Sequence, residues 1–184
     1  MQTILRPLCL SLALLAPLAA PAQAERAQQG LLAVFAPVQK GGPDRAARAE
    51  VKAAIKVALA NPPRGRIWCV PFARAVSGVE IRGNAKTWWD QAKGRYARGA
   101  EPRVGAVMAF AASRAMPKGH VAVVSKVIDD RTVLVDQANW ERNRITLDTV
   151  VVDVSAKGDW SQVRVANEAG SFGRVNPVKG FIYN

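Results

Sequence analysis

The chain has 184 residues, a single histidine, two cysteines and a formal net charge of +12 at pH 7. Since Cys9 lies in an N-terminal segment that we expect to be removed, an internal disulfide is excluded in the mature chain, and a zinc site of histidine and cysteine ligands is not expected. The basic charge suits an anionic partner, but no block of five or more like charges occurs, so a solubilising role fits equally well.

The first 24 residues have the pattern of a signal peptide. Arg6 gives a basic start, residues 8–18 are almost wholly apolar, and Ala22-Gln23-Ala24 is a small-x-small cleavage site. A buried helix or a retained anchor are the alternatives, but the apolar run is shorter than the roughly 20 residues of a comfortable span. We therefore predict a periplasmic or secreted protein without a stable membrane span after cleavage, and export disfavours nucleic acid as its partner.

Residues 25–62 are expected to form an N-terminal extension that is partly helical. A helix is predicted over residues 44–59, because Gly41-Gly42-Pro43 breaks the chain before it and Asn61-Pro62-Pro63 stops it. The extension either packs on the domain that follows or guards its cleft.

Residues 63–184 are predicted to form one α+β domain and to be monomeric. Residues 68–76 and 85–96 have helical spacing, and apolar runs or alternation then continue to the end of the chain. The connections are too short for helical crossovers, so the strands are expected to be mostly antiparallel. The predicted strands are residues 104–111, 120–127, 131–138, 150–154, 161–166 and 180–183.

Cys69, the sole cysteine of the mature chain, starts the helix at residues 68–76. Free N–H groups and the helix dipole at that end favour a thiolate and are expected to lower the pKa of the thiol. Cys69 is either a small buried hydrophobe or a reactive nucleophile, and export of a lone thiol favours the second reading.

His120 opens a strand, and strand pairing supplies it with partners. If Asp129-Asp130 is a two-residue turn, His120 faces Asn139 directly. Asn139 would then orient the imidazole as the third member of a catalytic triad. Asp136 is a rival but points to the opposite face, whereas Gln137 shares the face of Asn139 and could assist.

The tryptophans near these residues allow two roles. Trp140 either packs at the rim or shields the histidine from water. Trp88 and Trp89 are adjacent and cannot both point into one core, so one of them either packs or lines a cleft.

Several motifs, taken in order, resemble the CHAP family, the cysteine, histidine-dependent amidohydrolases/peptidases. They are Cys69-Val70-Pro71-Phe72-Ala73-Arg74, Trp88-Trp89-Asp90-Gln91-Ala92, Gly105-Ala106-Val107, Gly119-His120-Val121-Ala122-Val123-Val124 and Asp136-Gln137-Ala138-Asn139-Trp140. The tail from Val150 to Tyr183 looks like the extension of exported proteobacterial members.

The resemblance implies a papain-like fold, with N-terminal helices packed on a central antiparallel sheet. It also implies a cysteine hydrolase that cleaves amide bonds of peptidoglycan or its stem peptides, as an N-acetylmuramoyl-L-alanine amidase or an endopeptidase, without a cofactor or metal. By position, Cys69, His120 and Asn139 take the triad roles. Gln137 stands where many relatives carry a glutamate, and no glutamine precedes Cys69 to assist the oxyanion hole. A non-hydrolytic wall-binding module and a secreted toxin or interaction protein are the alternatives.

Overall fold

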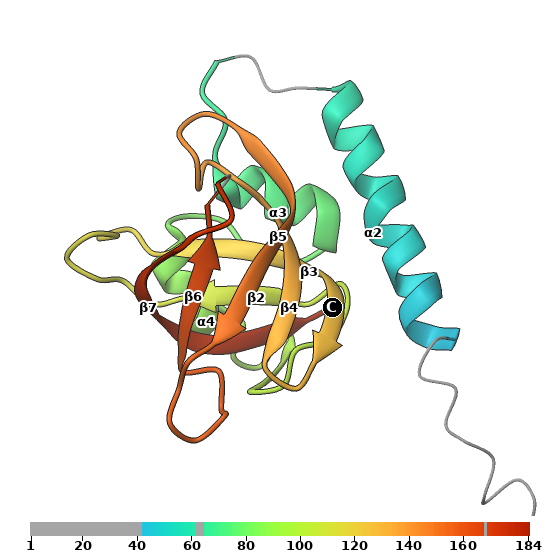
Figure 1. Ribbon diagram of the computed structural model, residues 1–184. Helices are drawn as coiled ribbons and strands as arrows, with labels where there is room; N and C mark the ends of the chain where they lie inside the picture. The colour runs from blue at the N-terminus through green and yellow to red at the C-terminus, as the bar shows by residue number, and fades with distance from the viewer. Residues whose placement is uncertain (1–41, 62–64, 168) are drawn as a thin grey trace, which may run out of the picture. The chain divides into compact units, whose positions relative to one another are not determined.

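The computed structural model describes residues 42–61, 65–167 and 169–184, arranged as helices followed by a sheet (Figure 1). The signal peptide predicted for residues 1–24 lies outside the described residues. The helical elements are α2 (Gly42–Ala60), α3 (Cys69–Ser77), the 3₁₀ turn η1 (Ala85–Thr87) and the short α4 (Trp88–Gln91). The strands are β1 (Ala97–Gly99), β2 (Val107–Phe110), β3 (His120–Asp129), β4 (Thr132–Ala138), β5 (Ile145–Asp153), β6 (Gln162–Ala166) and β7 (Phe172–Tyr183).

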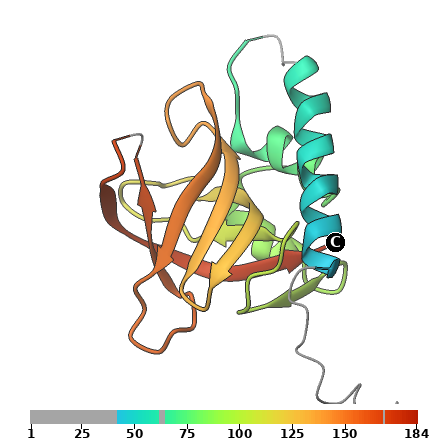
Figure 2. The ribbon, with the colours of Figure 1, turned by 45° about the vertical axis from the view of Figure 1, so that its right-hand side comes forward.

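The sheet closes on itself. Its strand order is β1-β7-β2-β3-β4-β5-β6, and β6 pairs again with β7. Every strand pair is antiparallel, as the short connections predicted. Strand β7, drawn in dark red in Figures 1 and 2, is long enough to pair with β1, β2 and β6.

Alternation along the strands divides the buried residues into two clusters. The inner cluster lies inside the closed sheet and receives side chains from all six strands of the closed circuit, for example Phe110, Ala122 and Val135. The outer cluster joins the opposite face of β2 and β3 to the helices, with Val121 and Val123 on the sheet side. Successive residues of β3 therefore serve different cores.

Helix α2 belongs to the same compact unit as the sheet, which spans Lys40–Asn184. Its Val51 and Ile55, four residues apart on one face, are 4% and 2% exposed and join the outer cluster beside α3 (Figure 2). Burying such a side chain stabilises the fold by roughly 1.5–3 kcal/mol. Of the two roles expected for this helix, packing on the domain is the one observed.

The helix predicted at residues 85–96 is wrong in its second half. The chain forms η1 and α4 and then leaves the helix through turns, because Gly94 takes a positive φ of 74°. Tyr96 then directs its hydroxyl to the backbone N–H of Glu80 at 2.9 Å, and β1 begins at the next residue. None of the described helices is both long and apolar enough to cross a membrane.

Candidate active site

Cys69 is the first residue of α3, as predicted. Trp68 before it is extended, with φ −128° and ψ 147°, and Gly78 ends the helix in the left-handed region with its N–H bonded to the carbonyl of Arg74. Pro71 stands in the first turn, where its missing N–H leaves no helical bond unmade. The helix start therefore fixes the position of the Cys69 backbone, and the side chain that it carries is half-buried.

The pKa of the Cys69 thiol is raised, contrary to the sequence-based expectation. Burial is the largest cause, and hydrogen bonds from the backbone N–H groups of Val121, Val70 and Cys69 itself only partly oppose it. A desolvated thiolate loses more than these N–H groups restore. The proton therefore rests on sulfur at neutral pH.

His120 lies at the start of β3, where it pairs with Phe110 of β2. Its ring packs edge-on against Phe110 and Trp140, with ring centroids 5.5 and 5.1 Å away, and the residue is only 5% exposed. Burial lowers the pKa of His120 to about 4, against a smaller opposing effect of a hydrogen bond to Gln137. The imidazole is neutral at neutral pH.

The hydrogen-bond partner of the His120 ring is Gln137. Its Oε1 lies 2.9 Å from His120 Nε2. A carbonyl oxygen only accepts, so Nε2 carries the proton and Nδ1 is left unprotonated. The bond selects the tautomer in which Nδ1 is free to act as a base.

The strand register explains why Gln137 reaches the histidine. Asp129 pairs with Thr132, so the β3–β4 turn falls one residue later than predicted, but two irregularities restore the expected pairing of Val123 with Asp136. Gln137 then shares the inner face with His120 as a diagonal neighbour, which a long side chain can reach.

Asn139 sits in the left-handed region with φ 60° and builds a turn. Its N–H donates to the carbonyl of Arg144 at 2.7 Å, and its Oδ1 accepts the N–H of Asn143 at 2.9 Å. Asn143 Oδ1 in turn accepts the N–H of Ile67 at 2.8 Å, two residues before Cys69. The His120 ring bonds to Gln137 rather than to Asn139. Asn139 lines the same cavity and holds Asn143, which ties the β4–β5 loop to the segment before the nucleophile.

Asp136 points away from His120, as the register predicted. Its fully buried carboxylate lies 3.1 Å from Lys52 Nζ of α2 and accepts the N–H of Asp148 at 2.7 Å. Burial raises the pKa of Asp136, although the Asp148 N–H and Lys52 oppose the shift. Asp136 holds α2 to the sheet and takes no part in the site.

Residues 61–139 match the family model of the CHAP domain. The match supports a CHAP domain in this chain and points to a hydrolase of the cysteine peptidase or amidase kind that acts on peptidoglycan-related substrates. The matched segment contains Cys69, His120, Gln137 and Asn139. A search of curated proteins found no match to the chain.

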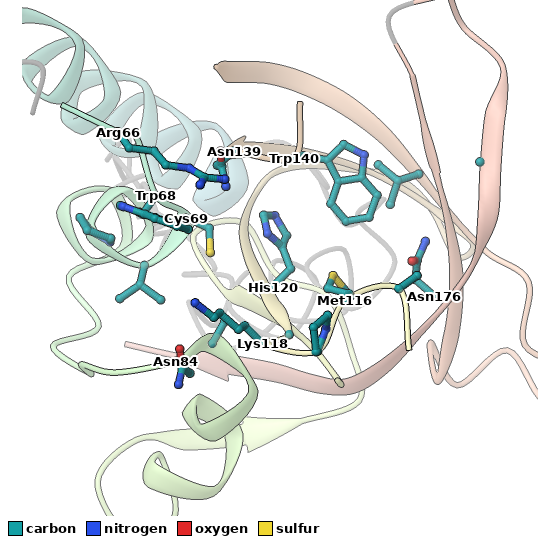
Figure 3. A pocket seen from close by; sticks show the side chains of 18 of the residues that line it. Arg66, Trp68, Cys69, Asn84, Met116, Lys118, His120, Asn139, Trp140 and Asn176 are labelled. Carbon is teal, nitrogen blue, oxygen red and sulfur yellow. The ribbon is translucent and has the colours of Figure 1, made fainter. Parts of the chain in front are cut away.

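The thiol and imidazole of the CHAP segment line one cavity of about 890 Å³ (Figure 3). Figure 3 shows Cys69 projecting from α3 and His120 from β3, with Trp140 and Asn176 on the other side of His120 from Cys69. Asn167, Arg174 and Asn176, which follow the matched segment, also line the cavity. Among the described residues, no three histidine, cysteine or carboxylate side chains are grouped as a metal site.

The structure decides between the roles that the sequence left open for the tryptophans. Trp140 packs on His120 and lines the cavity, whereas Trp88 is fully buried in the outer cluster and Trp89 stacks with Arg98 at 4.6 Å. The cleft-lining indole missed from the sequence is Trp68, which is 42% exposed beside the nucleophile. Its position next to Cys69 is the only sequence signal that could have suggested it.

Proposed function

We propose that this protein hydrolyses amide bonds of peptidoglycan with Cys69 as nucleophile and His120 as general base. The observation that carries the proposal is the neutral His120 ring on the wall of the Cys69 cavity, held by Gln137 with Nδ1 unprotonated. The CHAP match supports the reaction class. The nucleophile at the start of a helix and the base on an antiparallel sheet also agree with a papain-like arrangement.

The reaction proceeds by acyl transfer. His120 Nδ1 takes the thiol proton as sulfur attacks the amide carbonyl, and the backbone N–H groups at the start of α3 hold the resulting oxyanion. The imidazolium then gives its proton to the leaving amine, and a thioester remains on Cys69. Water attacks the thioester with His120 again as base, which releases the carboxylate and restores the thiol.

Gln137 is the residue that we assign to orient His120, in place of Asn139. A carbonyl acceptor at Nε2 stabilises the imidazolium that forms during attack and holds the ring in one orientation. Asn139 supports the site through the turn that it makes with Asn143 and Arg144.

The test compares the mature protein with its Cys69→Ala variant on purified peptidoglycan, with soluble fragments identified by mass spectrometry. Stem peptides with a free L-alanine amino terminus indicate an amidase, and cleaved cross-links or shortened stems indicate an endopeptidase. Both products must disappear in Cys69→Ala, while its thermal unfolding must match that of the parent. Fragment release by the alanine variant would refute the mechanism, and wall binding without release by either protein would favour a binding module.

We further propose that the protein is exported to the periplasm or beyond and acts as a monomer. The predicted signal peptide supports export, since Ala22-Gln23-Ala24 offers a cleavage site. Amino-terminal sequencing of the periplasmic protein checks it, and a mature chain that begins at Met1 would refute it. Size-exclusion chromatography with light scattering tests the monomer.

A further inference from the structure

The cavity is charged with one sign only. Three cations line it, Arg66, Lys118 and Arg174, and its lining contains no aspartate or glutamate among the described residues. His120 adds no charge at neutral pH, because burial lowers its pKa to about 4. An anionic group entering this cavity meets no repulsion from its walls.

Two of these cations are held at the nucleophile by one exposed indole. The guanidinium carbon of Arg66 lies 4.2 Å from the centroid of the Trp68 ring, and Lys118 Nζ lies 5.8 Å from it. Both distances are within the range of cation–π contacts. Trp68 directly precedes Cys69, and Arg66, Trp68 and Lys118 line the same cavity as the thiol (Figure 3).

Neither cation is neutralised within the described chain. The ion pairs of the described residues involve Arg48, Lys52, Arg74, Arg131 and Lys179, and none of them includes Arg66 or Lys118. The thiol does not require them either, because burial and backbone N–H groups set the pKa of Cys69. Charges that serve neither an ion pair nor the nucleophile remain available to a ligand.

We propose that Arg66 and Lys118 form a carboxylate subsite that selects amide substrates carrying a free carboxylate beside the scissile bond. The inference rests on the proposed amide hydrolysis and specifies its substrate. The Arg66 guanidinium can bind a carboxylate through two parallel N–H donors, and the Lys118 ammonium adds a further charge-assisted hydrogen bond. A substrate with a carboxamide at the same position loses both charge-assisted contacts.

The test uses two synthetic stem peptides that differ only in a free carboxylate or a carboxamide next to the cleaved amide. We expect the parent protein to favour the carboxylate peptide in kcat/KM by about 10-fold or more, since hydrogen bonds to charged groups contribute roughly 1.5–3 kcal/mol. Arg66→Gln with Lys118→Gln abolishes the preference, because kcat/KM for the carboxylate peptide falls to that for the carboxamide peptide. Lys126→Gln, which removes an exposed charge farther along β3, is the matched control and keeps the preference.

Binding of both peptides to the Cys69→Ala variant, measured by calorimetry, separates this inference from the hydrolase proposal. A carboxylate preference that disappears with Arg66→Gln and Lys118→Gln supports the subsite even if no peptide is hydrolysed. Equal binding of the two peptides overturns it even if both are hydrolysed. Equal loss of preference in Lys126→Gln also overturns it, because net charge would then explain the selectivity.

Discussion

Replacing His120 by glutamine should remove a specific pH dependence of stability. The pKa of His120 falls from 6.5 in the unfolded chain to about 4 in the folded protein, so only the unfolded state binds a proton between these values. Stability is then full above pH 6.5 and falls as the pH drops toward 4, by about 3 kcal/mol for a shift of this size. His120→Gln stays neutral throughout and lacks this loss.

The assay is urea unfolding at several values between pH 7 and pH 4, followed by the fluorescence of the five tryptophans. Asp136, whose pKa burial raises, titrates in both proteins, so the difference between them isolates His120. The free energy of unfolding of the parent, relative to that of the variant, should fall by about 3 kcal/mol between pH 7 and pH 4. Parallel pH profiles would refute the reasoning, since they would mean that the folded His120 titrates at its ordinary pKa.

Three other predictions address the site and the helix packed beside it. The acid limb of kcat/KM on a peptide amide should lie near pH 4, where His120 gains its proton, and a limb near 6.5 would contradict the buried base. Gln137→Leu should lower kcat by about 10- to 100-fold through loss of the imidazole orientation, whereas Asn139→Ala should chiefly destabilise the turn by about 1 kcal/mol; the reverse order would restore Asn139 as the orienting residue. Ile55→Ala should cost about 2–5 kcal/mol in thermal unfolding because the side chain is 2% exposed, against less than about 0.5 kcal/mol for Val57→Ala at 64% exposure, and equal effects would refute the packing of α2.

Local sequence patterns correctly predicted the helices and strands that depend mainly on residues near them in the chain. A breaker before and after residues 44–59 predicted α2, and Gly78 marked the end of α3. The apolar run after His120 predicted a strand over residues 120–127, and β3 covers it, with buried residues in both clusters. These features depend on neighbours in the chain, so one sequence is enough to read them.

The length of β7 could not be read in this way. Gly173, Pro177 and Gly180 resemble strand breakers, and the prediction accordingly kept only residues 180–183. In the fold, β7 bends past its neighbours with an irregularity opposite Ala109 and Phe110, and Gly180 takes a φ of 138° where the Trp89 ring leaves no room for a Cβ. Pairing with three strands compensates for the unfavourable residues, and that pairing is tertiary.

The hydrogen-bond partner of His120 could not be read from the sequence for a related reason. The predicted register was correct at Val123 and Asp136, yet direct opposition of Asn139 to His120 did not decide the hydrogen bond. Asn139 leaves the strand in the left-handed region, and its Oδ1 accepts the N–H of Asn143. The longer Gln137 side chain reaches His120 from the diagonal position on the neighbouring strand. A strand register shows which side chains share a face of the sheet. It does not show which of them is free to form a hydrogen bond with His120.

Burial sets the charge states of Cys69 and His120 at neutral pH. The desolvation that lowers the pKa of His120 also raises that of Cys69, so both groups are uncharged at neutral pH. In the proposed mechanism the proton leaves sulfur only as the amide carbonyl is attacked. The cations of the proposed carboxylate subsite, Arg66 and Lys118, lie where water still reaches them beside the exposed Trp68. A cation buried next to the thiol would instead stabilise a permanent thiolate. In the proposed mechanism, the exposed cations attract an anionic amide, while the buried thiol and imidazole stay uncharged until that amide is bound.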